Sequence, residues 1–139
     1  MSGNGRRLHD GARSVRRFFW LPRGTPRHPA RPVPLLRVWL ALLALGAGGA
    51  ALGLEWEGTF VLWLGTVYAM LDDVIKGVRH RWPAFAAALA VGWLVDRLAH
   101  ALVPAASDSL WGEYGVYVTW TLAALASFAA ITRLPSRQR

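Results

Sequence analysis

Two long apolar segments joined by a short basic turn constrain this chain more than any other feature of its sequence. Residues 59–75 and 83–103 are mostly apolar, and the turn between them carries the cations Lys76, Arg79 and Arg81. A water-soluble protein of 139 residues has too little other chain to cover two such helices. About twenty apolar residues do match the hydrocarbon thickness of a bilayer. The pattern therefore predicts a helical hairpin embedded in a membrane.

Two further apolar segments, at residues 35–54 and 114–132, have similar length and composition. Hydrophobic residues make up 54% of the sequence, and no segment outside these four could build a separate soluble core. We therefore expect an all-α membrane protein with four transmembrane helices in an up-down bundle. The expected organisation is a basic tail at 1–34, a transmembrane domain at 35–132 with spans at 35–54, 59–75, 83–103 and 114–132, and a second basic tail at 133–139.

The positions of the cations predict the orientation of the bundle. All of the sixteen lysines and arginines except Arg97 lie before or at the start of the first span, in the turn between the second and third spans, or after the fourth. Cationic residues are retained on the cytoplasmic side, so both termini are expected inside a multi-pass protein of the cytoplasmic (inner) membrane. The net charge of +8 falls in three separate blocks, which argues against a continuous surface for nucleic acid.

Proline and arginine dominate the segment before the first span. Because closely spaced prolines fix φ and lack backbone donors, residues 22–34 are expected to be extended and free of helix. Ahead of them, residues 16–21 mix two arginines with large aromatic side chains, a composition that suits an anionic lipid surface but also fits a solvated tail. The cations expected to contact anionic lipid at the cytoplasmic face are Arg13, Arg16, Arg17, Lys76, Arg79 and Arg81.

Small residues in the first span predict a surface where another helix can approach closely. Gly49 and Gly53 have small-xxx-small spacing, and the residues expected in this packing surface are Gly46, Gly49 and Gly53. Gly77 is placed to end the second helix, and Pro83 is placed to begin the third.

Charged residues within a span are functional candidates, because each costs roughly 2.5 to 3.5 kcal/mol at a helix centre. Asp72 and Asp73 lie within one turn of the expected inner boundary, where Lys76 and Arg79 can reach them. Asp72 and Lys76 have the i,i+4 spacing of a stabilising ion pair, so we favour structural pairing over a proton or cation site. Their depth differs from that of Asp96 by more than about 10 Å, which excludes one shared carboxylate site.

The third span contains Asp96, Arg97 and His100. Asp96 and His100 lie on one helical face, and Arg97 points about 100° away. Arg97 and His100 are expected to reach the outer interface, with Asp96 paired to either. The alternative is a buried polar cluster that faces the fourth helix, with Glu113 or Tyr117, in a proton pathway or a binding crevice.

Several aromatic residues are expected deep in the bundle. These residues are Trp63, Tyr68, Trp93 and Trp120. We expect their rings to pack between helices rather than to bind a ligand. Trp93 also lies one turn before Arg97, within reach of a cation–π contact.

The sequence offers no catalytic set. It has no cysteine, its four histidines are dispersed, and it lacks a phosphate-binding loop, a nucleophile elbow and a zinc motif. We therefore expect no enzymatic activity, no cofactor and no metal site.

The turn Glu55-Trp56-Glu57-Gly58-Thr59, followed by an apolar run, resembles the outer turn of the small four-span subunit four of actinobacterial cytochrome c oxidase. The resemblance covers this turn and the start of one helix. The long Arg/Pro tail and the charged third span depart from that pattern. The resemblance implies a class of protein, namely small accessory subunits with four helices and no chemistry of their own.

Three functions are compatible with these features. The first is a non-catalytic accessory or assembly subunit that packs against a larger membrane partner. The second is a holin-like or small pore-forming protein that assembles with itself. The third is a proton-coupled carrier that uses Asp96. The expected partners in every case are the lipid bilayer, anionic lipids, and another membrane protein or a second copy of the chain.

Overall fold

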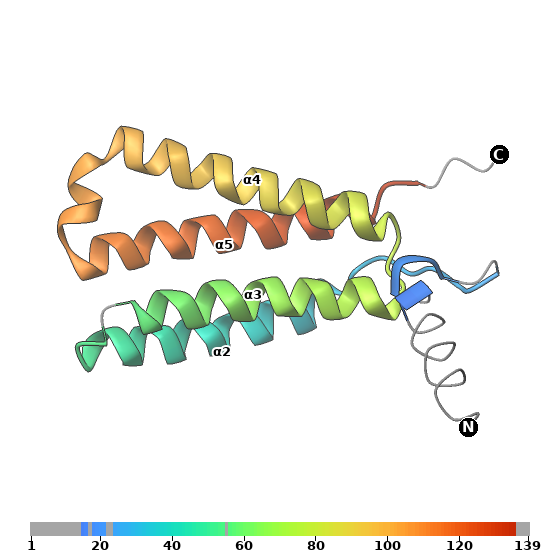
Figure 1. Cartoon of the computed structure of the whole chain (residues 1–139), viewed down its shortest axis with the longest axis horizontal. Helices are drawn as coiled ribbons and strands as arrows, with labels where there is room; N and C mark the ends of the chain where they lie inside the picture. Colours follow the sequence, from blue (N-terminus) through green and yellow to red (C-terminus); the bar gives the residue numbers. More distant parts are fainter. Residues whose placement is uncertain (1–14, 17, 22–23, 55, 136–139) are drawn as a thin grey trace, which may run out of the picture.

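The computed structural model describes residues 15–16, 18–21, 24–54 and 56–135 (Figure 1). Within this part of the chain all four long helices are long and apolar enough to cross a membrane, which confirms the prediction of an all-helical protein with four such segments. The elements are α2 (Pro32–Ala51), α3 (Glu57–Lys76), α4 (Arg81–Leu102), the short 3₁₀ helix η1 (Pro104–Asp108) and α5 (Leu110–Thr132).

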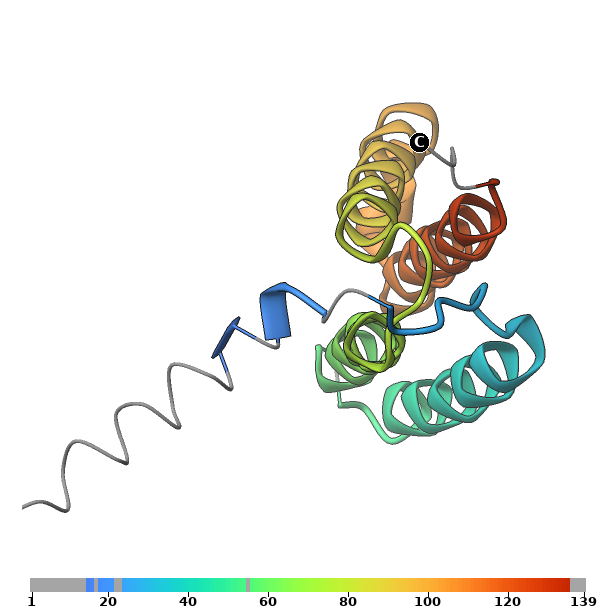
Figure 2. The ribbon, with the colours of Figure 1, turned by 90° about the vertical axis from the view of Figure 1, so that its right-hand side faces the viewer.

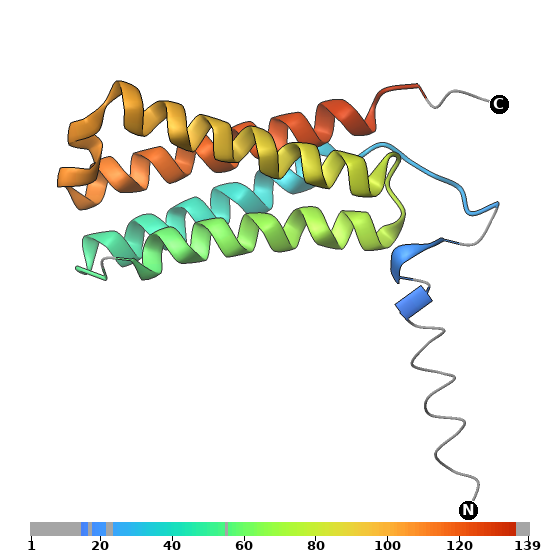
Figure 3. The same cartoon turned by 45° about the horizontal axis from the view of Figure 1, so that its top comes forward.

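The helices form two hairpins, α2 with α3 and α4 with α5. The connections within the hairpins lie at one end of the molecule, and the connection from α3 to α4 lies at the other, beside residues 24–31 (Figures 1 and 3). α5 joins the hairpins, because it packs along α4 and also contacts α3 and α2, as the end-on view shows (Figure 2). The largest side chain that is fully buried in the bundle, Phe128, belongs to α5.

All four long helices start two to four residues before the expected spans, at Pro32, Glu57, Arg81 and Leu110, and two of these starts, those of α2 and α4, involve a proline. α2 begins at Pro32 and includes Pro34, so residues 32–34 are helical rather than extended. α4 begins at Arg81, two residues before Pro83. Both differences have one cause: the first N–H groups of a helix have no intrahelical acceptor, so a proline in the first turn removes no helical hydrogen bond. α3 ends as predicted, at Gly77, whose φ of 93° is left-handed.

Glycines bring the helices of the first hairpin into backbone contact. A Cβ atom added to Gly58 would lie 2.5 Å from the carbonyl oxygen of Gly46, and one added to Gly46 would lie 2.7 Å from the carbonyl oxygen of Gly58. No side chain separates the two backbones there. Close approach of this kind is the usual basis of helix packing between apolar surfaces.

The second hairpin packs through a stripe of small residues on α4. Ala84, Ala88 and Gly92 are buried at intervals of four, and a Cβ atom on Gly92 would lie 2.9 Å from the ring of Trp120 on α5. The large ring therefore fits into the space that the glycine leaves. The spacing is visible in the sequence, although small-residue packing was predicted for the first span only.

Two hydrogen bonds, one buried and one partly buried, tie α2 to α5. The indole Nε1 of Trp39 donates to Oγ1 of Thr121 at 3.0 Å, and the hydroxyl of Tyr114 donates to the carbonyl oxygen of Leu43 at 2.6 Å. In an apolar environment no water competes for these donors, so each bond fixes the relative position of the two helices.

The segment just before α2 is part of the end of the bundle. The backbone N–H of Ala30 donates to Oγ1 of Thr132 at 3.1 Å, and the backbone N–H of Arg79 donates to the carbonyl oxygen of His28 at 2.9 Å. Ala30 is buried. Residues 28–30 thus bridge the α3–α4 connection and the C-terminal end of α5, with His28 and Pro29 exposed and Ala30 buried.

The glycine contact between α2 and α3 generates a stability prediction. Gly58→Ala should lower the free energy of unfolding by about 1–3 kcal/mol, because its methyl group meets a backbone oxygen that no side-chain rotation can move. Denaturant unfolding of the purified protein in detergent micelles measures this change.

Gly48→Ala is the matched control. It lies on α2 with nothing within 4 Å of the added atom, and alanine favours helix over glycine. The variant should equal or exceed the wild type in stability. Equal stability of Gly58→Ala and Gly48→Ala would contradict the backbone contact.

Candidate functional site

Polar side chains gather at the α3–α4 end of the bundle. Nζ of Lys76 donates to Oδ2 of Asp72 at 2.5 Å, one helical turn away. The neighbouring Asp73 is half-buried, and its carboxylate makes no hydrogen bond or ion pair with another described residue. The two adjacent aspartates therefore differ: Asp72 is paired within α3, and Asp73 is available.

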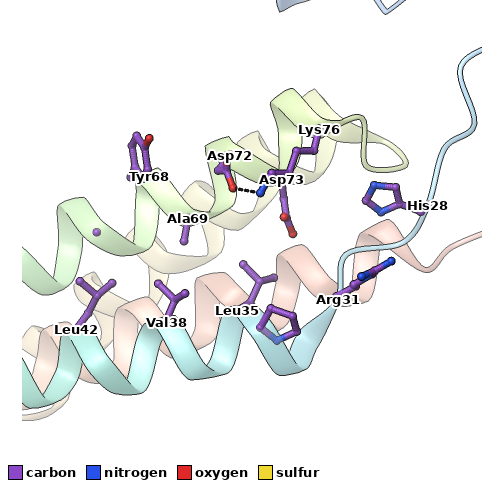
Figure 4. A pocket seen from close by; sticks show the side chains of 12 residues that line it. His28, Arg31, Leu35, Val38, Leu42, Tyr68, Ala69, Asp72, Asp73 and Lys76 are labelled. Carbon is purple, nitrogen blue, oxygen red and sulfur yellow. Dashed lines mark hydrogen bonds and ion pairs between the residues drawn. The ribbon is translucent and has the colours of Figure 1, made fainter.

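The Asp73 carboxylate faces a groove of about 520 Å³ between α2 and α3 (Figure 4). Lys76, His28 and Arg31 line the groove mouth, and all three are close enough to interact with Asp73 electrostatically, Lys76 most strongly. Arg31 is exposed, and no other described residue pairs with its guanidinium. This grouping was absent from the sequence prediction, since the prediction placed residues 28 and 31 in an independent tail.

The groove exists because α2 and α3 diverge toward this end. Farther along the hairpin a Cβ atom on Gly65 would lie 2.5 Å from Cδ2 of Leu42, so the helices touch there. Leu35, Val38 and Ala69 form apolar walls between this contact and the charged mouth (Figure 4). The groove is therefore apolar at its closed end and charged at its open end.

The second polar group lies near the other end of α4. Nδ1 of His100 is 2.9 Å from the backbone oxygen of Asp96 and 3.6 Å from its Oδ1. The guanidinium of Arg97 lies 5.4 Å from the ring centre of Trp93. Both contacts are local to α4. The ring of Trp93 and the side chain of Arg97 point away from the bundle and are exposed.

The alternative of one polar cluster with α5 finds limited support. Glu113 and Tyr117 line a separate pocket of about 310 Å³ with residues of α3, and Asp96 is not among its lining residues. Asp96 and Glu113 are both near enough to Tyr117 to act on it electrostatically. No hydrogen bond or ion pair between described residues links Asp96 to either of them.

Arg81 is placed differently from the sequence prediction. It is only 7% exposed, so it does not face lipid as an anionic-lipid contact should. One Nη atom donates to the carbonyl oxygen of Phe18, while Nε and the other Nη have no acceptor among the described residues. The aromatic rings of the same segment pack on the neighbouring Trp82, with the centres of Phe18 and Phe19 5.4 and 5.5 Å from its ring centre.

The other expected lipid contacts occupy mixed positions. Arg16 and Lys76 are exposed, and Arg79 is half-buried. Arg79 makes no ion pair with either aspartate of α3 among the described residues. Arg13 and Arg17 lie outside the part of the chain that the structure describes.

Gly53 does not belong to the packing surface of α2. It lies in the turn after the helix, with a left-handed φ of 77° and nothing within 4 Å of an added Cβ atom. The small-residue contact is formed instead by Gly46 and Gly49 against Gly58. Helix α2 ends earlier than expected, which removes Gly53 from its surface.

The deep aromatic residues divide into two groups. Trp120 is buried, and its ring centre lies 6.4 Å from that of Trp63, so these two pack between helices. Tyr68 and Trp93 are 70% and 57% exposed, which corrects the expectation that they pack inside the bundle. Helical periodicity explains the difference: Tyr68 lies opposite the buried Thr66–Met70 face, and Trp93 lies beside the buried stripe of α4.

Within the described residues no group of three or more His, Asp or Glu side chains could hold a metal ion. On α3 and α4, Asp72 and Lys76 form an ion pair, Arg97 makes a cation–π contact and His100 is bonded to a backbone oxygen, whereas Asp73 makes no such contact with a described residue. The chemistry that this arrangement offers is therefore the binding of charged groups at the mouth of the α2–α3 groove.

No known protein family, curated protein or solved structure matches this chain at a significant level.

The buried guanidinium generates a second stability prediction. Arg81→Met should leave the free energy of unfolding within about 1 kcal/mol of the wild type or raise it, because methionine buries the same stem without two unpaired nitrogens. Denaturant unfolding in detergent measures it.

Thr132→Val provides the contrasting variant at the same end. It keeps the shape of a fully buried side chain but leaves the Ala30 N–H without an acceptor, which should cost about 1–3 kcal/mol. A larger loss for Arg81→Met than for Thr132→Val would show that the guanidinium is satisfied and structurally required.

Proposed function

We propose that this protein crosses the cytoplasmic membrane four times, with both termini inside, and acts without catalysis as an accessory or assembly subunit of a larger membrane protein. The observation that carries the proposal is the outward face of α4, which combines an exposed cation with large apolar side chains on the least buried of the four long helices.

The distribution of charge along the bundle supports the orientation. Residues 24–31, the α3–α4 connection and the C-terminal end of α5 lie at one end of the molecule (Figure 1). These segments carry cations, among them Arg133 directly after α5. The connections at residues 52–56 and 103–109 lie at the other end and contain no lysine or arginine. A bilayer retains cationic connections on the cytoplasmic side. The end that holds residues 24–31 and Arg133 is therefore the cytoplasmic one.

The face of α4 fits a protein partner better than it fits lipid alone. Trp93, Leu94 and Leu98 are half or more exposed, and Arg97 lies among them. Arg97 is five residues before the end of α4, roughly 7–8 Å along the helix axis. Its backbone therefore lies within the apolar layer of the membrane. A partner helix that presents a carboxylate or backbone oxygens to Arg97 would lower the cost of holding that charge there.

A different protein suits this face better than a second copy does. In a two-fold symmetric dimer the same patch contacts itself, so two Arg97 side chains would approach each other across the interface. Like charges that are close in a medium of low dielectric constant repel strongly. A heterologous partner has no such constraint.

Single cysteines test the topology without background, because the sequence contains none. Ser107→Cys, in the α4–α5 connection, should react with a membrane-impermeant maleimide in intact cells. Leu134→Cys, after α5, should react only when the membrane is permeabilised. Both side chains are exposed, so a difference in labelling reports the side of the membrane and not burial within the protein. The reverse labelling pattern would contradict the proposed orientation.

Site-specific crosslinking tests the partner. A photo-crosslinking residue at Leu94, on the outward face of α4, should join the chain to one protein of larger mass in membranes of the native host. The same residue at Leu45, which is exposed on α2, should not form that adduct. Trp93→Ala with Arg97→Ala should reduce the adduct at least tenfold, while the amount of the variant in the membrane remains unchanged.

Other products would support the competing functions. An adduct of twice the chain's own mass from Leu94 would favour self-assembly, as a holin-like or pore-forming protein requires, and would contradict the accessory role. A proton-linked flux that is lost on Asp96→Asn would favour the carrier.

A further inference from the structure

We propose that the groove between α2 and α3 is a binding site for phosphatidylethanolamine, a phospholipid whose headgroup carries a phosphate and a primary ammonium. The site is the cavity of about 520 Å³ whose mouth lies beside Asp73 and Arg31 (Figure 4). The proposal rests on the membrane location given above, but not on the accessory role.

The groove has the polarity of a phospholipid. Its closed end is lined by Leu35, Val38, Leu42 and Ala69, which offer only carbon atoms to a ligand. Its open end is lined by charged side chains from α3 and from the segment before α2, and the two ends are separated along the helix axes (Figure 4). An acyl chain fits the first part and a headgroup fits the second. Cavities of this size are typical of small-molecule sites.

Among the described side chains, the mouth presents one free carboxylate and one free cation. Lys76 is already bound to Asp72 by an ion pair, although its charge also acts on Asp73. The charges left are the Asp73 carboxylate on α3 and the Arg31 guanidinium just before α2, with the His28 ring beside them. A ligand complementary to this pair carries a positive and a negative group a short distance apart, which is the definition of a zwitterionic headgroup.

The two headgroup charges match these side chains in kind as well as in sign. A guanidinium binds a phosphate through two parallel N–H donors, and a primary ammonium donates up to three hydrogen bonds to carboxylate oxygens. The quaternary ammonium of phosphatidylcholine has no N–H to donate to Asp73. The glycerol headgroup of phosphatidylglycerol carries no cation. This lipid is a net anion, so the Asp73 carboxylate would have no positive group to bind.

The position of the mouth agrees with the depth of a headgroup. Asp73 lies three residues before the end of α3, about 5 Å along the helix axis, so it sits just inside the cytoplasmic end of the span. From there the apolar walls continue toward the middle of the bundle. Val38 and Tyr68 are exposed at the edge of the groove, so a chain in it remains continuous with the surrounding acyl layer.

Native mass spectrometry of the full-length protein, purified and delipidated in detergent, tests the proposal. The probes are phosphatidylethanolamine, phosphatidylcholine and phosphatidylglycerol with identical acyl chains. We expect saturable binding of one phosphatidylethanolamine, about tenfold or more tighter than either other lipid, because each loses a charge-assisted hydrogen bond. Equal binding of the three lipids, or tighter binding of phosphatidylglycerol, would overturn the proposal.

Matched variants locate the site. Asp73→Asn should abolish the preference for phosphatidylethanolamine over phosphatidylcholine, and Arg31→Gln should weaken the binding of both. Asp96→Asn and Arg37→Gln remove the same charges outside the groove and should leave binding unchanged. Ala69→Phe fills the apolar end without altering any charge and should reduce all binding to the non-saturable background. A preference that survives Asp73→Asn and Ala69→Phe would place the lipid elsewhere and overturn the assignment.

Failure of this inference is distinguishable from failure of the proposed function. Lipid preference is measured on the isolated chain and is independent of the Leu94 adduct. A chain that forms the adduct but shows no headgroup preference retains its proposed function and refutes the lipid site. A chain that shows the headgroup preference but forms no adduct keeps the lipid site and refutes the proposed accessory role.

Discussion

The whole arrangement depends on backbone contact at small residues. The four long helices are apolar around most of their circumference, so burial of apolar surface alone distinguishes poorly between their faces. Lipid tails can cover such a surface as well as another helix can, and close van der Waals contact then decides which faces meet. Gly46 against Gly58 brings α2 to α3, and Gly92 against Trp120 brings α4 to α5.

A few polar bonds then fix how the two hairpins sit on each other. Trp39 and Tyr114 each make a hydrogen bond between α2 and α5, and the Ala30 N–H reaches Thr132 at the end of the bundle. These bonds are few, but each satisfies a donor in an environment where it has no other acceptor. The Ala30 bond, together with the bond from the Arg79 N–H to the carbonyl oxygen of His28, holds residues 28–31 at this end of the bundle, so Arg31 lines the same groove as Asp73.

The charged residues consequently have different surroundings at the two ends. At the α3–α4 end, Asp73 and Arg31 both line the mouth of a groove that leaves room for a ligand. Near the other end of α4, the His100 ring lies 2.9 Å from the backbone oxygen of Asp96 and 3.6 Å from its carboxylate, while Arg97 and Trp93 point outward. The first arrangement is suited to a small zwitterion, and the second to a neighbouring helix. Both interpretations follow from which charges are already paired within the chain.

The sequence by itself determined the helices and the local pairs. Their length and apolar composition predicted four spanning segments, and i,i+4 spacing predicted the contacts of Asp72 with Lys76 and of Arg97 with Trp93, because such contacts need only one helix. Only the tertiary structure decided which faces are buried. Arg81 is buried and donates to the carbonyl oxygen of Phe18, and residue 28 packs against the α3–α4 connection. These contacts join residues far apart in the chain, and helices that are apolar on nearly every side carry no periodic signal to predict them.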